Sequence, residues 1–211
     1  MDIQAYQVWR KSLVELHKKI LKTLPENTIP ECARILGLLQ NRTVVLDDED
    51  QIQILMDLAI YEPVLPGNHS AFDLYMAAHK PESDIEEELL NAMTNSRTSL
   101  FEITEVHPHT HQLVYEDLLD PSTGKVIVTD INFSQTAQVG IVVFTRIVPV
   151  PNCSLTSGAA FPFSGELKKY LIRRHKVVMK KLAFENANVR RYAAFFRLNR
   201  SEGLPTTFEQ V

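Results

Sequence analysis

The hydrophobic repeat of this chain changes twice along its length, and these changes limit the folds available to it. Before residue 99, apolar residues recur every three or four positions, which is the spacing of amphipathic helices. From Leu100 to Phe163 the period falls to about two, as in strands. After Gly165 the helical spacing returns, and Asn186-Ala187-Asn188 is a polar sequence that can break this helix before a second piece that carries Val189. We therefore expect an α+β protein with a helical region over residues 1–98, a five-stranded antiparallel, barrel-like β module over 99–164, a long basic helix over 165–200 packed on the rest, and a tail over 201–211.

The N-terminal region should hold five helices. Tyr6, Trp9 and Leu13 begin an apolar stripe that predicts a first helix over about residues 2–24, and Pro25 ends it. Each of the other four follows a sequence that favours a helix start, either a capping residue or an acidic run. These helices are predicted over 32–40 after Thr28, from Ile52 after Asp47-Asp48-Glu49-Asp50, near 70–79 from Ser70, and near 83–97 from Ser83.

Five segments rich in Val, Ile, Phe and Thr predict the strands of the β module. They span residues 100–106, 112–119, 125–133, 140–150 and 153–163. Pro121 and Gly124 lie between the second and third segments in a sequence typical of a tight turn, so these two strands should form a hairpin. Short strands in this number indicate a small antiparallel barrel or a strongly bent sheet, of SH3-like or OB-like size.

Four stretches of the β module carry a resemblance to a known sequence pattern. They are Ser99-Leu100-Phe101-Glu102-Ile103, Glu116-Asp117-Leu118-Leu119 before the Thr123-Gly124 turn, Thr145-Arg146-Ile147-Val148-Pro149, and Leu155-Thr156-Ser157-Gly158. Residues 99–163 resemble an uncharacterised β module of bacterial proteins, some of which also carry a SEC-C zinc motif. The resemblance implies a bacterial cytoplasmic protein of unknown function. The clustered ligands of SEC-C are absent, so no zinc function carries over.

Charged residues within the predicted strands draw attention to Arg146 and Asp117. A charged side chain in a strand must face solvent or find a partner, because burying an unpaired charge is costly. We expect these two residues to pair with each other inside the β module.

Basic residues gather near the C-terminus, although the net charge of the chain is −4. Residues 166–200 contain eleven Lys or Arg and only two acids, so the remainder is strongly acidic. Such segregation indicates either an anionic partner or attraction between two parts of the same fold. The predicted contact surface consists of Lys168, Lys169, Arg173, Arg174, Lys176, Lys180 and Lys181. Its partner would be an acidic protein or a nucleic acid, and an internal electrostatic clamp is the other interpretation.

Three histidines in five residues, His107, His109 and His111, suggest a second kind of site. Alternate side chains of an extended segment lie on one face, so a pair of imidazoles could bind one metal ion. A complete site would need further ligands from Glu102, Glu105, Glu116 or Asp117. A metal-dependent enzyme is therefore the alternative function, and a polar loop between two strands is the simpler interpretation.

Other chemistry is not supported by the sequence. No serine lies in the G-x-S-x-G pattern of a nucleophile elbow, and the glycine spacing excludes both a dinucleotide fingerprint and a phosphate loop. We expect no catalytic residues and no cofactor. The two cysteines, Cys32 and Cys153, are predicted to be free thiols, as in a reducing cytoplasm. No apolar run is long enough to predict a transmembrane segment, and the oligomeric state stays open.

Overall fold

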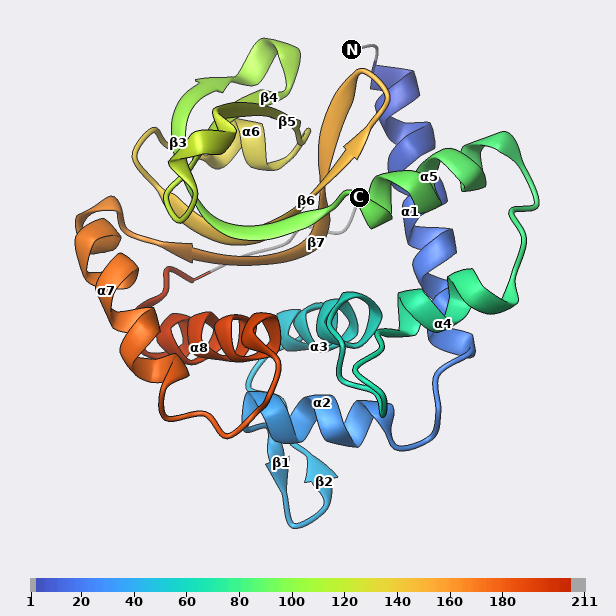
Figure 1. Ribbon diagram of the computed structural model, residues 1–211. Coiled ribbons are helices and arrows are strands. Elements are labelled where there is room, and N and C mark those ends of the chain that lie inside the picture. Colours follow the sequence, from blue (N-terminus) through green and yellow to red (C-terminus); the bar gives the residue numbers. More distant parts are fainter. Residues whose placement is uncertain (1–2, 206–211) are drawn as a thin grey trace.

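Five strands close into a small barrel, which forms the upper left part of the molecule in Figure 1. They are β3 (Arg97–His107), β4 (Gln112–Asp117), β5 (Lys125–Thr129), β6 (Val142–Val150) and β7 (Cys153–Phe163), in the spatial order β3-β4-β5-β7-β6. The structure is a computed structural model that describes residues 3–205. The five predicted strands and the α+β class are confirmed.

The barrel is mixed, so the expectation of a wholly antiparallel module is wrong. β5 and β7 run parallel, joined at Val128 and Ser154, whereas every other neighbouring pair is antiparallel. The reason is one of parity. A closed ring with an odd number of strands cannot alternate direction all the way round, so at least one pair must be parallel. Five strands and complete closure were therefore incompatible with a fully antiparallel arrangement.

The connections between strands follow from local sequence. The predicted hairpin between β4 and β5 is confirmed: Asp120 accepts a hydrogen bond from the Ser122 backbone, the chain passes through η2 (Pro121–Thr123), and Gly124 takes a positive φ of 69°. η1 (Pro108–Thr110) joins β3 to β4, and α6 (Phe133–Thr136) lies between β5 and β6.

The five predicted N-terminal helices are present. They are α1 (Ile3–Lys22), α2 (Thr28–Leu36), α3 (Asp50–Tyr61), α4 (Ala71–Ala78) and α5 (Asp84–Thr94). Ser70 and Asp73 form a complete capping box at the start of α4. α2 ends earlier than expected, because Gly37 adopts the left-handed conformation, and a small hairpin of β1 (Leu39–Gln40) and β2 (Thr43–Val44) follows.

The C-terminal segment forms two helices, with the second beginning at the expected polar break of Asn186-Ala187-Asn188, so the single helix over 165–200 is wrong. α7 (Lys168–Met179) follows η3 (Gly165–Leu167), and α8 (Ala187–Glu202) begins after a connecting segment. Asn186 caps α8 by accepting hydrogen bonds from the backbone N–H groups of Asn188 and Val189. A polar side chain that satisfies the first free N–H groups starts a new helix at this point.

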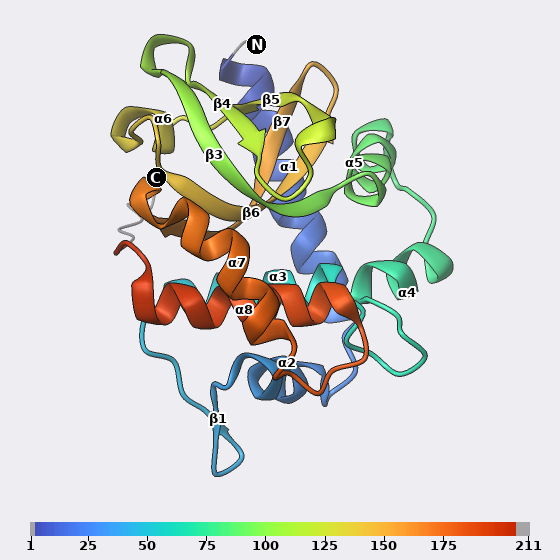
Figure 2. The same ribbon diagram turned by 60° about the vertical axis from the view of Figure 1, so that its left-hand side comes forward.

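α8 lies under the barrel beside α3 and fills the centre of the main core (Figures 1 and 2). The Phe195 ring stacks on Phe144 of β6 with centroids 4.2 Å apart, and Phe196 meets Phe161 of β7 edge-on at 5.9 Å. Tyr192 donates a hydrogen bond to the carbonyl oxygen of Ile54 in α3. α8 therefore joins the helical layer to the barrel.

A second core lies where α1, α4 and α5 pack on the ends of β6 and β7. Its buried members include Leu13, Ile20, Leu90, Val148 and Leu155. A third cluster, with Phe101 and Tyr115, fills the barrel itself. Across residues 3–205, every helix is too short or too polar to cross a bilayer.

Candidate functional site

The basic residues of the predicted contact surface lie on α7 and the turn that follows it, where six of the seven are exposed. Within residues 3–205, none of these six forms an ion pair. They are Lys169, Arg173, Arg174, Lys176, Lys180 and Lys181. Lys168 differs, because its ammonium group pairs with Glu102 of β3. We call the six exposed residues the basic face of α7.

The opposite side of α7 holds the helix against α8. Leu171 and His175 are its buried residues, and the His175 ring stacks on Phe195 with centroids 5.0 Å apart. Burial lowers the pKa of His175, so the imidazole is uncharged at neutral pH. The apolar and neutral side therefore faces the fold, and the cations face outward.

A shallow hollow of about 390 Å³ lies on the basic face of α7. Lys169, Arg173 and Arg174 surround the exposed side chains of Tyr170 and Val177. A surface that combines cations with an aromatic ring suits an anionic partner that also offers flat or apolar groups.

More of the basic residues of α8 than of α7 form hydrogen bonds or ion pairs within the chain. Arg190 donates to the carbonyl oxygen of Phe184, Arg191 donates to the side chain of Asn188, and Arg200 pairs with Asp47. Arg197 is exposed. Among the described helices, α7 therefore presents the densest set of uncommitted cations.

The three histidines lie at the end of β3 and on the loop that joins it to β4. His107 Nε2 is 3.2 Å from a Glu105 oxygen, His109 lies in η1, and His111 takes a left-handed backbone conformation just before β4. Within residues 3–205 no group of three His, Cys, Asp or Glu side chains is arranged to hold a metal ion. The metal-dependent enzyme therefore gains no support from the geometry.

Arg146 and Asp117 do not pair, so that expectation is wrong. On β3, Thr98 lies opposite Arg146 and Phe101 lies opposite Asp117. These two β3 residues are an odd number of positions apart, so the charged side chains point to opposite faces of the sheet. Asp117 accepts a hydrogen bond from Ser99 at 2.6 Å, and Arg97 lies 3.7 Å from its other oxygen.

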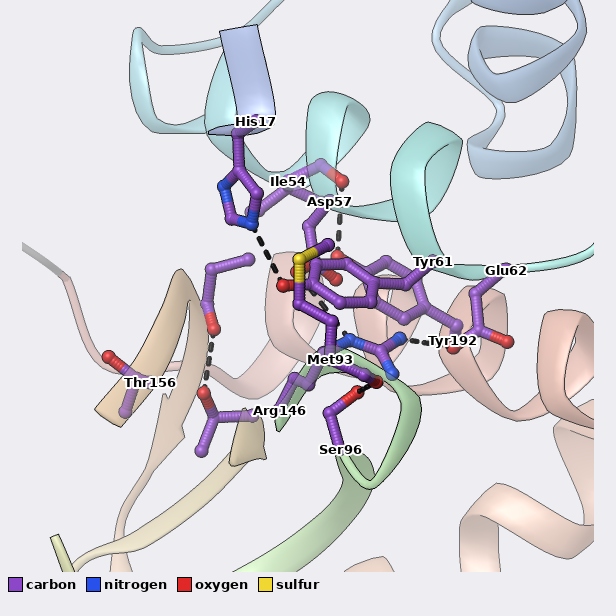
Figure 3. A network of polar contacts seen from close by, with 12 residues as sticks. His17, Ile54, Asp57, Tyr61, Glu62, Met93, Ser96, Arg146, Thr156 and Tyr192 are labelled. Atoms are coloured by element: carbon purple, nitrogen blue, oxygen red, sulfur yellow. Dashed lines mark hydrogen bonds and ion pairs between the residues drawn. The ribbon is translucent and has the colours of Figure 1, made fainter. Parts of the chain in front are cut away.

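Arg146 instead reaches α3 and forms a buried charge network (Figure 3). Its Nη2 donates to Glu62 Oε1 at 2.5 Å, and its Nε lies 3.7 Å from Asp57 Oδ1. The guanidinium carbon also lies 4.2 Å from the centroid of the Tyr61 ring, within reach of a cation–π interaction. One cation thus lies between two carboxylates at the contact between barrel and helices.

An irregularity in the sheet accompanies Arg146. Thr145 pairs with Ala160 and Ile147 pairs with Thr156, so three residues of β7 lie opposite Arg146 alone. Gly158, in the middle of those three, has a φ of 110°, a conformation that side chains disfavour. Such bulges bend a strand and redirect its side chains.

Burial and charge act in opposite directions on this network. Burial raises the pKa of Asp57, and the charge of Arg146 only partly opposes that rise. Burial lowers the pKa of Arg146, but Asp57 and Glu62 more than offset this effect, so its pKa is raised and the guanidinium stays charged. No well-formed hydrogen bond from the described residues reaches either oxygen of Asp57. Asp57 is thus the least satisfied member of the network.

His17 of α1 extends the network through Tyr61. Its Nε2 is hydrogen-bonded to the Tyr61 hydroxyl at 2.8 Å. Burial, followed by the charges of Arg10 and Arg146, lowers the pKa of His17 to about 3. His17 is therefore neutral throughout the physiological range.

A pocket of about 540 Å³ opens beside this network. Its wall comes from the end of α3, the starts of α4 and α8, and strands β3 and β6. Three arginines, Arg97, Arg146 and Arg191, line it together with Glu62 and Asp73. We call this cavity the arginine pocket.

Sequence reasoning identified Arg146 but missed its partners and the pocket. Asp57 lies within the apolar run from Ile54 to Ile60, and a single acid inside such a run is the signal that could have marked it. Glu62 directly follows α3 and carries no such signal. The arginines of the pocket come from distant parts of the chain, which no local pattern brings together.

The cysteines offer no reactive group. Both are free thiols, as predicted, with Cys32 buried and Cys153 half-buried. Burial raises the pKa of Cys32 to about 12 and that of Cys153 to about 11. Both thiols are therefore protonated at neutral pH and poor nucleophiles.

Comparisons with known proteins give one family and no relative of established function. No curated protein and no solved structure matches the chain. The resemblance of residues 99–163 to a bacterial β module stays a prediction. One family model, described as a family of unknown function (DUF7986), matches residues 1–209, and the chain therefore belongs to that family.

Proposed function

We propose that this protein is a non-catalytic binding protein, and that the basic face of α7 contacts a polyanionic partner, either an acidic protein or a nucleic acid. One observation carries the proposal: six exposed cations lie between residues 169 and 181 without an ion pair among residues 3–205 and without an acid in that stretch. Cations brought together in this way repel one another, and an anionic partner relieves the repulsion.

The pairing pattern also bears on the internal clamp. A clamp would join these cations to the acidic remainder of the chain, yet only Lys168 has such a partner. Surface ion pairs contribute at most about 1 kcal/mol each, so Lys168 and Glu102 together would stabilise the fold only slightly. This pattern favours a docking surface.

Binding across a salt series tests the proposal. Fluorescent single-stranded and double-stranded DNA and RNA, and an acidic polypeptide such as polyglutamate, would be titrated with the full chain. For a nucleic acid, contact with three to six phosphates predicts a slope of log affinity against log salt of about −2 to −5. Comparison of the probes identifies the class of partner. Failure of all of them to bind at low salt would refute the proposal.

A matched pair of variants locates the surface. K169E/R173E/R174E reverses three charges of the basic face, and K11E/K22E/K80E reverses three exposed lysines elsewhere. The first variant should lose at least about tenfold in affinity, whereas the second should lose much less, since contact charges dominate polyanion binding. Both should melt close to the native protein, because neither breaks an ion pair described above. Equal losses in the two variants would show that net charge, and not α7, controls binding.

A further inference from the structure

The arginine pocket lies apart from the basic face of α7 and has a different character. Its arginines come from β3, β6 and α8, so they meet only in the folded protein. Its volume of about 540 Å³ falls within the usual range of small-molecule sites, about 300–1,000 Å³. A volume of this size suits a compact ligand.

We propose that the arginine pocket binds a small phosphorylated molecule that carries hydroxyl groups, such as a sugar phosphate. Arg146 is only 6% exposed and yet lines the cavity. Of its guanidinium nitrogens, only Nη2 makes a hydrogen bond to the described residues, and that bond goes to Glu62. Its Nε is buried and faces Asp57 Oδ1 at 3.7 Å, which leaves Nη1 as the nitrogen to which a phosphate oxygen could be an acceptor.

The charge of the second arginine, Arg191, is balanced even less by nearby acids. Arg191 is half-buried, and its hydrogen bond goes to the neutral side chain of Asn188 at 3.1 Å. No carboxylate of residues 3–205 pairs with it. Arg97 completes the set, held at 3.7 Å from Asp117. Three guanidinium groups around one cavity match the doubly charged phosphate group better than a single carboxylate.

The two acids that line the pocket are already committed. Glu62 accepts the hydrogen bond from Arg146, and Asp73 accepts one from the Ser70 backbone at 2.8 Å within the capping box of α4. The starts of α4 and α8 also face the cavity, and the positive ends of helix dipoles favour anions. A hydrogen bond does not remove the charge of a carboxylate, so the main source of positive charge in the pocket is Arg191, which has no carboxylate partner among residues 3–205.

Neutral polar groups complete the wall and point to a hydroxylated ligand. Asn68 and Asn188 offer amides, and Ser96 offers a hydroxyl. Asn186 donates to Asn68 at 3.0 Å, which ties the start of α8 to the loop before α4 across one side of the cavity. Amides and hydroxyls both donate and accept, as sugar hydroxyls do, so they can position the uncharged part of the ligand.

Calorimetric titration of the full chain with inorganic phosphate, glucose 6-phosphate and glucose tests this proposal. Glucose 6-phosphate should bind more tightly than inorganic phosphate, and glucose should not bind. R191Q removes one cation of the pocket and should weaken glucose 6-phosphate binding by about tenfold, the effect of losing a charge-assisted hydrogen bond. R191K keeps the charge and should lose less than R191Q.

R197Q is the matched control, because Arg197 lies on the same helix, is exposed and lies outside the pocket. It should bind glucose 6-phosphate within about twofold of the native protein. K169E/R173E/R174E should also keep this affinity, which separates the pocket from the basic face of α7. The proposal is overturned if neither phosphate compound binds, if R191Q and R197Q behave alike, or if binding is lost in the α7 variant instead.

Discussion

Arg146 holds a positive charge between two buried carboxylates, and its replacement tests how far the three groups depend on one another. R146M keeps much of the side-chain volume but leaves Asp57 and Glu62 buried without a cation. The loss of one partner from a buried ion pair costs about 3–5 kcal/mol. Urea denaturation should therefore show a loss of this size in the free energy of unfolding.

The triple variant R146M/D57N/E62Q provides the control for that measurement. It removes the carboxylate charges together with the arginine, so it should be more stable than R146M alone. If R146M were as stable as the native protein, the network in Figure 3 would make no net contribution.

His17 makes the stability of the protein dependent on pH. Its pKa is about 3 in the folded chain but about 6.5 when exposed. Between these values the unfolded state binds a proton that the folded state does not, so stability falls as the pH drops below about 6.5. The contribution is at most about 1.4 kcal/mol per pH unit.

H17Q removes the titrating group, and H109Q on the exposed loop serves as its control. Thermal melts from pH 7 to pH 4 should show a smaller loss of stability in H17Q than in the native protein, and an unchanged loss in H109Q. An identical pH profile for H17Q and the native chain would show that His17 is accessible to protons in the folded state.

Arg146 also shows what the sequence could and could not predict. A charge in a strand pattern correctly marked Arg146 as a residue in need of a partner. Its partners, Asp57 on α3 and Glu62 directly after it, lie more than 80 positions away in the sequence. Pairing over such a distance depends on how the layers pack, which the local pattern does not encode.

Periodicity located the five N-terminal helices and the five barrel strands to within a few residues. The structure departs from the prediction in the direction of one strand pair and in elements of only two to four residues. Strand direction around a ring is a global property, so the parallel pair of β5 and β7 followed from closure and not from any local segment. The two-residue strands β1 and β2 and the four-residue helix α6 are too short to show a period.

The boundary between α7 and α8 illustrates the role of capping. Leu171 and Val189 continue an apolar pattern on both sides of the break, and the polar Asn186-Ala187-Asn188 between them is the local signal that can interrupt it. Asn186 competes with that pattern by binding the first N–H groups of α8 with its side chain. The separation leaves α7 free to expose its cations while most of the apolar residues of α8 are buried.

Across the whole molecule, the cores do not separate into a helical part and a β part. The main core joins α2, α3 and α8 to Phe144 and Phe161 of the barrel, and the second joins α1 and α5 to Val148. We therefore expect residues 3–205 to unfold as one cooperative unit. Urea transitions followed by the fluorescence of Trp9, the single tryptophan, and by far-ultraviolet circular dichroism should coincide.

A fragment of residues 97–163 tests the same prediction from the other side. Alone, it would expose Phe144, Phe161 and Phe163, which are covered in the intact chain. It should therefore be unfolded or aggregated, as judged by circular dichroism and light scattering. A soluble fragment with a cooperative melt, or two separate transitions in the full chain, would show that the barrel is an independent domain.

The central position of α8 has a consequence for how the protein is made. A ribosome synthesises every strand of the barrel before it reaches residues 187–202. The aromatic surface of β6 and β7 therefore stays uncovered until α8 has been made. Until α8 leaves the ribosome, the nascent chain exposes this aromatic surface to solvent, where it can aggregate. Chaperones that bind exposed aromatic segments during translation should therefore matter more to the yield of this protein than to one whose core closes early.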